Sequence, residues 1–251
     1  MEGGYMQEKI SREQGIPGHE GIIDSLSPGF TNRYYSLRPS VGLRRSTKNL
    51  QLSFLARIEM GRMENRLNGQ DVSRADVCYF TPLVSVESDY GQGKRIAFIY
   101  SSSVNTPGAN QLLPVVNNLN PLLLTTGNRS LKPDYAHEAG VNWLRFDQFS
   151  FTSLFASLDF TYTHNKIGWA RTVNDSLGQA LQPVNVPDDY FASASIDYSV
   201  PVRKLGLTFH TSLREGWERG ITLINRVENI NTNLSHRLTV SFDNRRKEKW
   251  D

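Results

Sequence analysis

The sequence lacks the features that define several common classes of protein. Its single cysteine, Cys78, cannot form an intrachain disulfide, so no disulfide framework holds the fold together. No run of about eighteen apolar residues occurs, which excludes a membrane-spanning helix. The 28 basic and 25 acidic residues nearly cancel, and a net charge of +3 does not indicate a nucleic-acid-binding protein.

The beginning of the chain lacks an apolar segment. Residues 1–15 read MEGGYMQEKISREQG, without the hydrophobic stretch that a secretory signal needs. Two explanations stay open: the protein remains inside the cell, or the chain lacks its natural beginning. We expect residues 1–31 to form an irregular or loop segment before the ordered domain.

Motifs of catalysis and metal binding are absent as well. The five histidines are scattered, and the sequence contains no HExxH, CxxC or GxSxG pattern. No group of residues supplies a nucleophile, a base and an anion site together. The sequence therefore predicts no catalytic residue, no cofactor and no metal ion, and an enzyme is the least supported class.

Alternation of apolar and polar residues is the strongest pattern that is present. In residues 154–163, LFASLDFTYT, the side chains of Leu154, Leu158 and Phe160 point to one side of an extended chain. Asp159 and Thr161 point to the other side. The same alternation recurs at residues 50–60, 78–88, 189–200, 203–213 and 233–242, and more weakly at 33–44, 95–103 and 135–146. We count nine strands and no convincing helix.

Strand length and connector length favour a membrane barrel. Several strands keep their alternation for about ten residues, the length that a tilted membrane-spanning strand needs. Short and long connectors alternate along the chain, with long loops expected at 61–76, 104–134, 164–188 and 214–232. This parity is typical of an up-and-down meander with tight turns on one side of a membrane. We predict an all-β, antiparallel up-and-down meander of about nine to ten long strands over residues 32–251, part of a transmembrane β-barrel.

In such a barrel the apolar side of each strand faces lipid and the polar side faces a wet interior. The residues predicted to face lipid are Leu52, Phe54, Leu154, Leu158, Phe160, Leu207, Phe209, Val240 and Phe242. The alternative is a soluble β-barrel carrier whose apolar faces turn inward around a small ligand.

One loop and the strand after it carry a recognisable motif. Residues 127–135 read GNRSLKPDY, and Leu113-Pro114 and Asn120-Pro121 precede them. This arrangement resembles the outer-membrane β-barrel family related to TonB-dependent receptors of Gram-negative bacteria, whose members carry a GNP-x-LKPE segment before a strand. Arg129 replaces the usual proline and Asp134 the usual glutamate. By motif order and strand spacing the resemblance covers roughly residues 33–251.

The motif has a local physical explanation. Gly127 and Asn128 tolerate a positive φ and are expected to make a turn. Pro133 favours an extended Lys132, and Tyr135 then begins a strand. We interpret Gly127, Asn128, Leu131, Lys132, Pro133 and Tyr135 as a structural corner between loop and strand rather than a ligand site.

The resemblance implies a location in the bacterial outer membrane and a barrel of about twenty-two strands that encloses a plug. Its expected partners are outer-membrane lipid, the plug, the remaining strands of the barrel and, through the full-length protein, a TonB-type energy-coupling protein. We expect this chain to be a piece of such a receptor or transporter, with long loops that bind a ligand for uptake. An adhesion or binding barrel without transport stays open beside the soluble carrier, and the sequence does not indicate a substrate.

Overall fold

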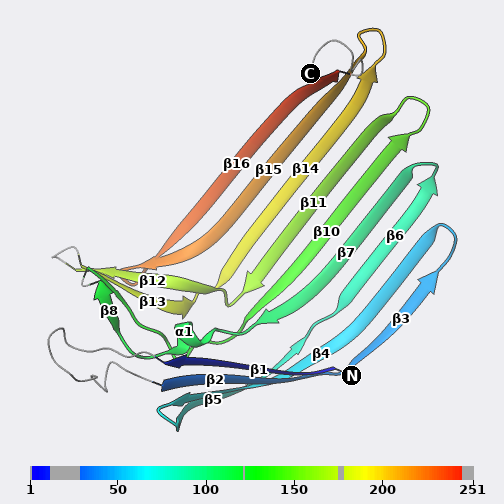
Figure 1. The fold of residues 1–251 in the computed structure, drawn as a ribbon. Coiled ribbons are helices and arrows are strands. Elements are labelled where there is room, and N and C mark those ends of the chain that lie inside the picture. The colour runs from blue at the N-terminus through cyan, green and yellow to red at the C-terminus, as the bar shows by residue number, and fades with distance from the viewer. Residues whose placement is uncertain (1, 12–28, 121, 175–177, 245–251) are drawn as a thin grey trace.

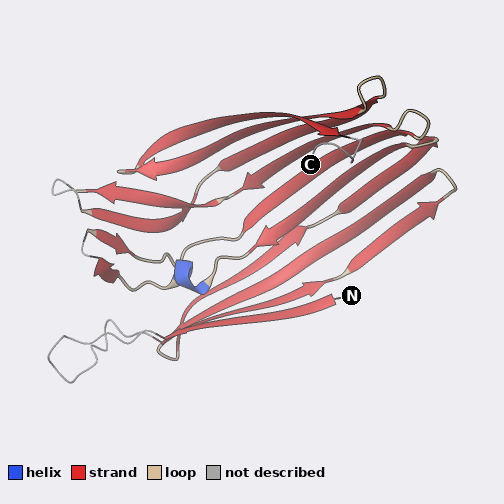
Figure 2. Cartoon of the chain, turned by 45° about the horizontal axis from the view of Figure 1, so that its top comes forward, coloured by secondary structure: helices blue, strands red, loops and turns tan. Residues whose placement is uncertain are grey.

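The computed structural model describes residues 2–11, 29–120, 122–174 and 178–244. These residues form one broad, curved β-sheet, and shorter elements gather at one of its ends (Figures 1 and 2). Helix α1 (Ala109–Leu112) is the one α-helix in this part of the chain. No helix of the described residues is long and apolar enough to cross a membrane.

The sheet is built mainly from neighbours in sequence that pair antiparallel. Its strands are β1 (Glu2–Ser11), β2 (Gly29–Arg38), β3 (Ser40–Ser46), β4 (Leu50–Leu67), β5 (Gln70–Phe80), β6 (Leu83–Gly91), β7 (Lys94–Asn105), β8 (Asn117–Asn120), β9 (Leu123–Thr125), β10 (Asp134–Asp147), β11 (Thr152–His164), β12 (Ile167–Val173), β13 (Gln179–Asn185), β14 (Asp188–Val202), β15 (Leu207–Ile224) and β16 (Val227–Asn244). The predicted all-β antiparallel meander is confirmed.

Two prolines help to explain why the structure has sixteen strands rather than nine to ten. Strands β2 and β3 pair with successive parts of β4 along one edge, and Pro39 separates them. Strands β5 and β6 do the same on the other edge, and Thr81-Pro82 separates them. Proline lacks the N–H group that a β-ladder needs. The short strands β8, β9, β12 and β13 supply the rest of the difference.

Two of the four predicted long loops are wrong. Strand β4 runs on to Leu67 and turns at Asn68 and Gly69, which have φ values of 51° and 83°. Strand β15 runs on to Ile224 and turns through two further positive-φ residues. These strand extensions carry polar residues on both faces. Their backbone is extended, but hydropathy does not alternate along it, and the sequence pattern therefore did not mark them as strands.

The other long connectors contain structure of their own. Residues 104–134 hold α1, β8 and β9, and residues 164–188 hold β12 and β13. The segment 1–31, expected to be irregular, contains β1 and the start of β2 within the described residues, whereas residues 12–28 lie outside them. These short elements form the end of the molecule opposite the tight turns (Figure 2).

The register shows that the strands are staggered. Through successive strand pairs, Gln51 on β4 lies level with Arg214 on β15, six strand-to-strand steps away. The last residue of β15 that pairs at the tight-turn end is Leu207, seven residues further along that strand. With about 3.3 Å per residue and about 4.8 Å between strands, this stagger corresponds to a tilt of about 40°, as in membrane β-barrels.

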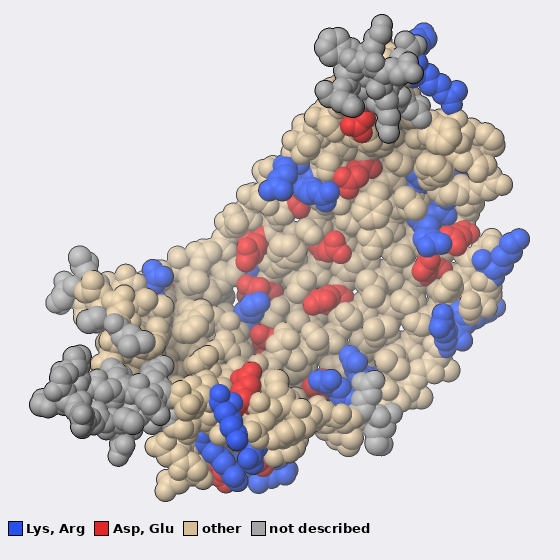
Figure 3. All heavy atoms as spheres, in the orientation of Figure 1, with Lys and Arg blue, Asp and Glu red and all other residues tan. Residues whose placement is uncertain are grey.

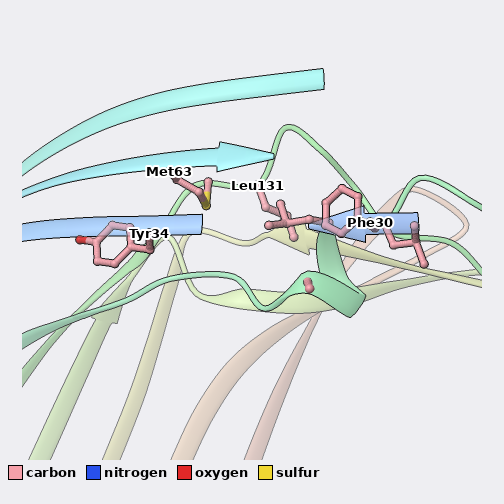
Figure 4. Packing of buried hydrophobic residues seen from close by; sticks show 7 residues of the cluster. Phe30, Tyr34, Met63 and Leu131 are labelled. Carbon is pink, nitrogen blue, oxygen red and sulfur yellow. The ribbon is translucent and has the colours of Figure 1, made fainter. Parts of the chain in front are cut away.

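Among the described residues, the buried apolar core lies away from the tight turns. There the chain between β7 and β10 folds over the sheet, and α1 packs against β1 and β2 (Figure 4). The buried cluster comprises Phe30, Tyr34, Met63, Ala109, Leu112, Leu113 and Leu131. The Glu8 carboxylate on β1 accepts a hydrogen bond of 2.6 Å from the backbone N–H of Ala109, which fastens the start of α1. The sheet is therefore double-layered at this end.

A buried polar cluster lies beside this core. Tyr34 donates a hydrogen bond of 3.0 Å to Glu59, and Arg38 approaches the same carboxylate oxygen at 3.0 Å. The Tyr34 ring lies over Gly61, where an added Cβ would come within 2.6 Å of the ring carbons. Burial raises the pKa of Tyr34 above its usual value, and the neighbouring Glu59 charge raises it further.

We expect Tyr34→Phe to lower the free energy of unfolding by about 1–2 kcal/mol, because Glu59 loses a buried hydrogen-bond donor. The effect has a defined pH dependence. A group whose pKa is raised on folding stabilises the fold fully below its unfolded pKa of about 10 and loses that contribution as pH rises toward its folded pKa. Urea unfolding at pH 8 and pH 11 measures this; equal pH dependence in wild type and variant contradicts the role given to Tyr34.

Candidate membrane wall and loop corner

The register divides the main sheet into two faces. Residues directly opposite each other on paired strands share a face, so each side can be followed from β3 to β16. We call the side that contains Leu158 the apolar face and the side that contains Asp159 the polar face. The apolar face carries all nine residues predicted to face lipid, on strands β4, β11, β15 and β16.

The side chains of the apolar face are open rather than packed into a core. Leu158 is 55% exposed and Phe242 is 63% exposed, whereas Phe30 in the core is 1% exposed. Exposed apolar patches of this extent are rare on soluble monomers. The arrangement contradicts a soluble carrier with these residues turned inward, and their contact with lipid stays a prediction.

A row of aromatic rings crosses the apolar face at one level. His137 lies between Tyr100 and Tyr162, with ring centroids 6.2 Å and 5.9 Å away. Tyr162 contacts Tyr190 at 5.2 Å, and Tyr190 contacts Trp217 at 6.4 Å. These rings come from five strands, β7, β10, β11, β14 and β15. A row of this kind is typical of the boundary between lipid and water.

A second aromatic group lies near the tight turns. Trp143 donates a hydrogen bond to the hydroxyl of Tyr90, and the rings of Phe209 and Phe242 are 5.3 Å apart. On β15 the two bands are separated by the eight residues from Phe209 to Trp217. Eight residues span about 27 Å of strand, or about 20 Å across the sheet at the tilt derived above. This height approaches the apolar band of about 25 Å in membrane barrels.

The polar face is lined by hydroxyl and charged groups. Ser53 and Ser85 hydrogen-bond at 2.8 Å across β4 and β6, and Ser157 and Ser195 do so across β11 and β14. Ion pairs lie on the same face, with 2.8 Å between Arg95 and Asp89 and 3.4 Å between Arg214 and Asp197. Figure 3 shows acidic and basic side chains spread across the face of the sheet that is turned to the viewer.

The predicted corner motif is assembled at the two-layered end. The backbone N–H of Gly127 donates to the carbonyl of Leu113 at 2.8 Å, and that of Asn128 donates to Gln111 at 2.7 Å. Gly127 and Asn128 tolerate a positive φ, but neither adopts one here. Glycine is required for another reason: an added Cβ at residue 127 would lie 2.4 Å from the Leu113 carbonyl oxygen.

The rest of the motif joins this loop to two strands. Asn128 donates a side-chain hydrogen bond of 3.1 Å to the carbonyl of Pro183. Lys132 and Asn185 exchange two hydrogen bonds of 2.8 Å and 2.9 Å. Leu131 enters the core, Pro133 is fully buried, and the Tyr135 hydroxyl donates to the backbone carbonyl of Phe80. The six predicted residues thus lie at one junction, where the insertion meets β10 and β13.

The sequence did not reveal the partners of this motif. Pro183 and Asn185 lie on β13, inside a segment that was expected to be a loop. Neither has a local pattern that indicates contact with residues about 55 positions earlier. Among the described residues, no three or more histidine, cysteine, aspartate or glutamate side chains gather where they could hold a metal ion.

A family model described as "Outer membrane protein beta-barrel family" matches residues 41–251. The chain belongs to this family. The match includes the corner motif and every strand of the apolar face, and it places this barrel protein in the bacterial outer membrane. No curated protein matches the chain.

Several solved structures similar to this barrel protein are receptors or transporters. The hemophore receptor HasR of Serratia marcescens has 16% identity and a TM-score of 0.55 over 86% of this chain and 38% of its own. The FrpB iron transporter of Neisseria meningitidis has 12% identity and a TM-score of 0.47 over 76% of this chain and 26% of its own. The siderophore receptor PirA of Pseudomonas aeruginosa has 12% identity and a TM-score of 0.47 over 86% of this chain and 51% of its own. The chain therefore spans about a quarter to a half of these structures, and the HasR likeness concerns the fold alone.

Proposed function

We propose that this chain forms part of the wall of an outer-membrane receptor or transporter barrel. The observation that carries the proposal is the division of the sheet into one apolar and one polar face from β3 to β16. In lipid, backbone groups must be paired within the protein, and a sheet achieves this through its neighbouring strands. The apolar face then contacts acyl chains, and the polar face lines an aqueous interior.

The two-layered end supplies the receptor part of the proposal. The core residues Phe30 and Met63 lie on the polar face of β2 and β4, so the insertion of residues 106–133 covers the lumen side of the wall. Segments held over the mouth of a barrel are well placed to meet a ligand before it enters. The corner motif fixes this insertion and has a positioning role in the proposal.

The further strands of the barrel, a plug and an energy-coupling protein are the proposed partners of this chain. Strand β16 has β15 as its paired neighbour in the described chain, and its 18 residues leave a long open edge. Such an edge is unfavourable in lipid, so we expect further strands of the full-length protein to cover it. A plug inside the lumen and a TonB-type protein that acts on it complete the proposed uptake system. Because HasR is a hemophore receptor, haem is a first class of ligand to test.

Uptake separates this proposal from an adhesion barrel. We expect a deletion strain to lose uptake of at least one solute from a panel that includes haem and ferric chelates, and the restored gene to recover it. The matched control restores the gene in a strain without the energy-coupling protein, where uptake should stay low. Unchanged uptake of every solute, with loss of surface attachment, contradicts transport and favours the adhesion barrel.

A further inference from the structure

One pair of ionisable residues interrupts the apolar face between the two aromatic bands. Glu215 on β15 and His236 on β16 lie directly opposite each other, and His236 Nδ1 hydrogen-bonds Glu215 Oε2. Other ionisable residues on this face of the described strands lie at the tight turns, in the ring row or beyond it. Ionisable groups at membrane depth are costly and usually functional, so this pair needs an explanation.

The pair lies within an apolar surround. Leu213 and Leu238 precede it on one side, and Trp217 and Leu234 follow it on the other. Leu234 is 62% exposed and Leu238 is 67% exposed, and the side chains of Glu215 and His236 are also substantially open. Protein–protein contacts usually enclose their most strongly contributing residues in neighbours that exclude water, and the apolar side chains around this pair supply such an enclosure.

The hydrogen-bonding capacity of the pair is only half used. When the pair is neutral overall, whether as carboxylate and imidazolium or as carboxylic acid and imidazole, His236 Nε2 carries a proton to donate. Glu215 Oε1 then has free acceptor capacity. Within the described residues neither atom has a hydrogen-bond partner in the structure, and acyl chains can supply none.

A donor beside an acceptor is complementary to itself under two-fold symmetry. In an isologous contact, Nε2 of one copy meets Oε1 of the other, and the same bond forms twice. We propose that the outer wall formed by β15 and β16 docks a second copy of this protein through Glu215 and His236. The surrounding leucines of the two copies pack around the four polar side chains. The inference rests on the lipid-facing assignment and is independent of any transported solute.

Cysteine cross-linking in native outer membranes tests the interface. In a Cys78→Ser background, Leu238→Cys places a thiol two residues from His236 on the apolar face. Leu158→Cys is the matched control, because Leu158 is similarly exposed on the same face but lies on β11. We expect a cross-linked dimer with Leu238→Cys and none above background with Leu158→Cys.

A second variant tests whether Glu215 and His236 themselves stabilise the contact between copies. The pair Glu215→Leu and His236→Leu, added to Leu238→Cys, makes the wall fully apolar and should leave assembly intact, as heat-modifiable migration will show. We expect the dimer yield to fall about tenfold, equivalent to about 1.4 kcal/mol. Equal yields at residues 238 and 158 overturn the proposal and leave contact with lipid alone. A yield at residue 238 that survives the double substitution overturns the role of Glu215 and His236 in the contact.

Discussion

Leu158→Arg is expected to lower the free energy of unfolding of the barrel by about 2–4 kcal/mol, the cost of an arginine at the middle of a bilayer. Leu158 lies midway between Leu154 and Tyr162 on β11, so both interfaces are about equally far away. Its side chain is 55% exposed on the apolar face. Denaturant unfolding of the full-length protein in lipid vesicles measures the loss.

Asp159→Arg provides the matched control for this variant. Asp159 is the next residue on the same strand, is exposed, and lies on the polar face. An arginine there meets water and the carboxylate of Glu138 nearby, so we expect a change within about 0.5 kcal/mol. Equal losses for the two variants would mean that the two faces see the same solvent, which contradicts the account.

Gly127→Ala is expected to loosen the insertion and to cost about 2–3 kcal/mol, the range for overpacking a tight site. The new Cβ would meet three backbone atoms, namely the oxygen and nitrogen of Leu113 and the oxygen of Gln111, at 2.4–2.8 Å. Backbone atoms cannot rotate away as a side chain can, so α1 must move from the core. Faster proteolysis within residues 106–133 measures this loosening.

Gly168→Ala is the control for the corner variant. Gly168 lies on β12 at the same end of the molecule, and an added Cβ would be in ordinary contact with Val186 at 3.5 Å. We expect no loss of stability, because the substitution restricts the unfolded chain without a clash in the folded one. If both variants are cut at the wild-type rate, the close approach of Gly127 to α1 is not important for the insertion.

The sequence predicted the part of the sheet between the two aromatic bands because hydropathy alternates there. Leu52, Leu158 and Phe242 each lie on a strand that has one apolar and one polar face. Because successive side chains point to opposite faces, apolar and polar residues alternate along such a strand. Beyond the aromatic row the two faces of a strand no longer differ in hydropathy. Glu59 and Asn65 are buried on β4 while Met60 is exposed, so hydropathy no longer marks a strand there.

One readable signal was overlooked in that region. Asn68-Gly69 is the commonest two-residue sequence for a tight hairpin, and it stands in the middle of the supposed loop 61–76. For the corner motif, the sequence identified the residues but not the reason for one of them. Its six residues were identified from the sequence, but the reason for Gly127 is the backbone of α1, a contact that depends on how the insertion folds back.

The most direct test of the account is the solvent that each residue of β11 meets. In a Cys78→Ser background, nitroxide labels placed singly at residues 154–163 report collisions with oxygen, which concentrates in lipid, and with a water-soluble nickel chelate. We predict a two-residue period, with oxygen dominant at Leu154, Leu158 and Phe160 and the chelate dominant at Ser157, Asp159 and Thr161. An absent period, or one of opposite phase, contradicts the claim that the apolar face contacts lipid.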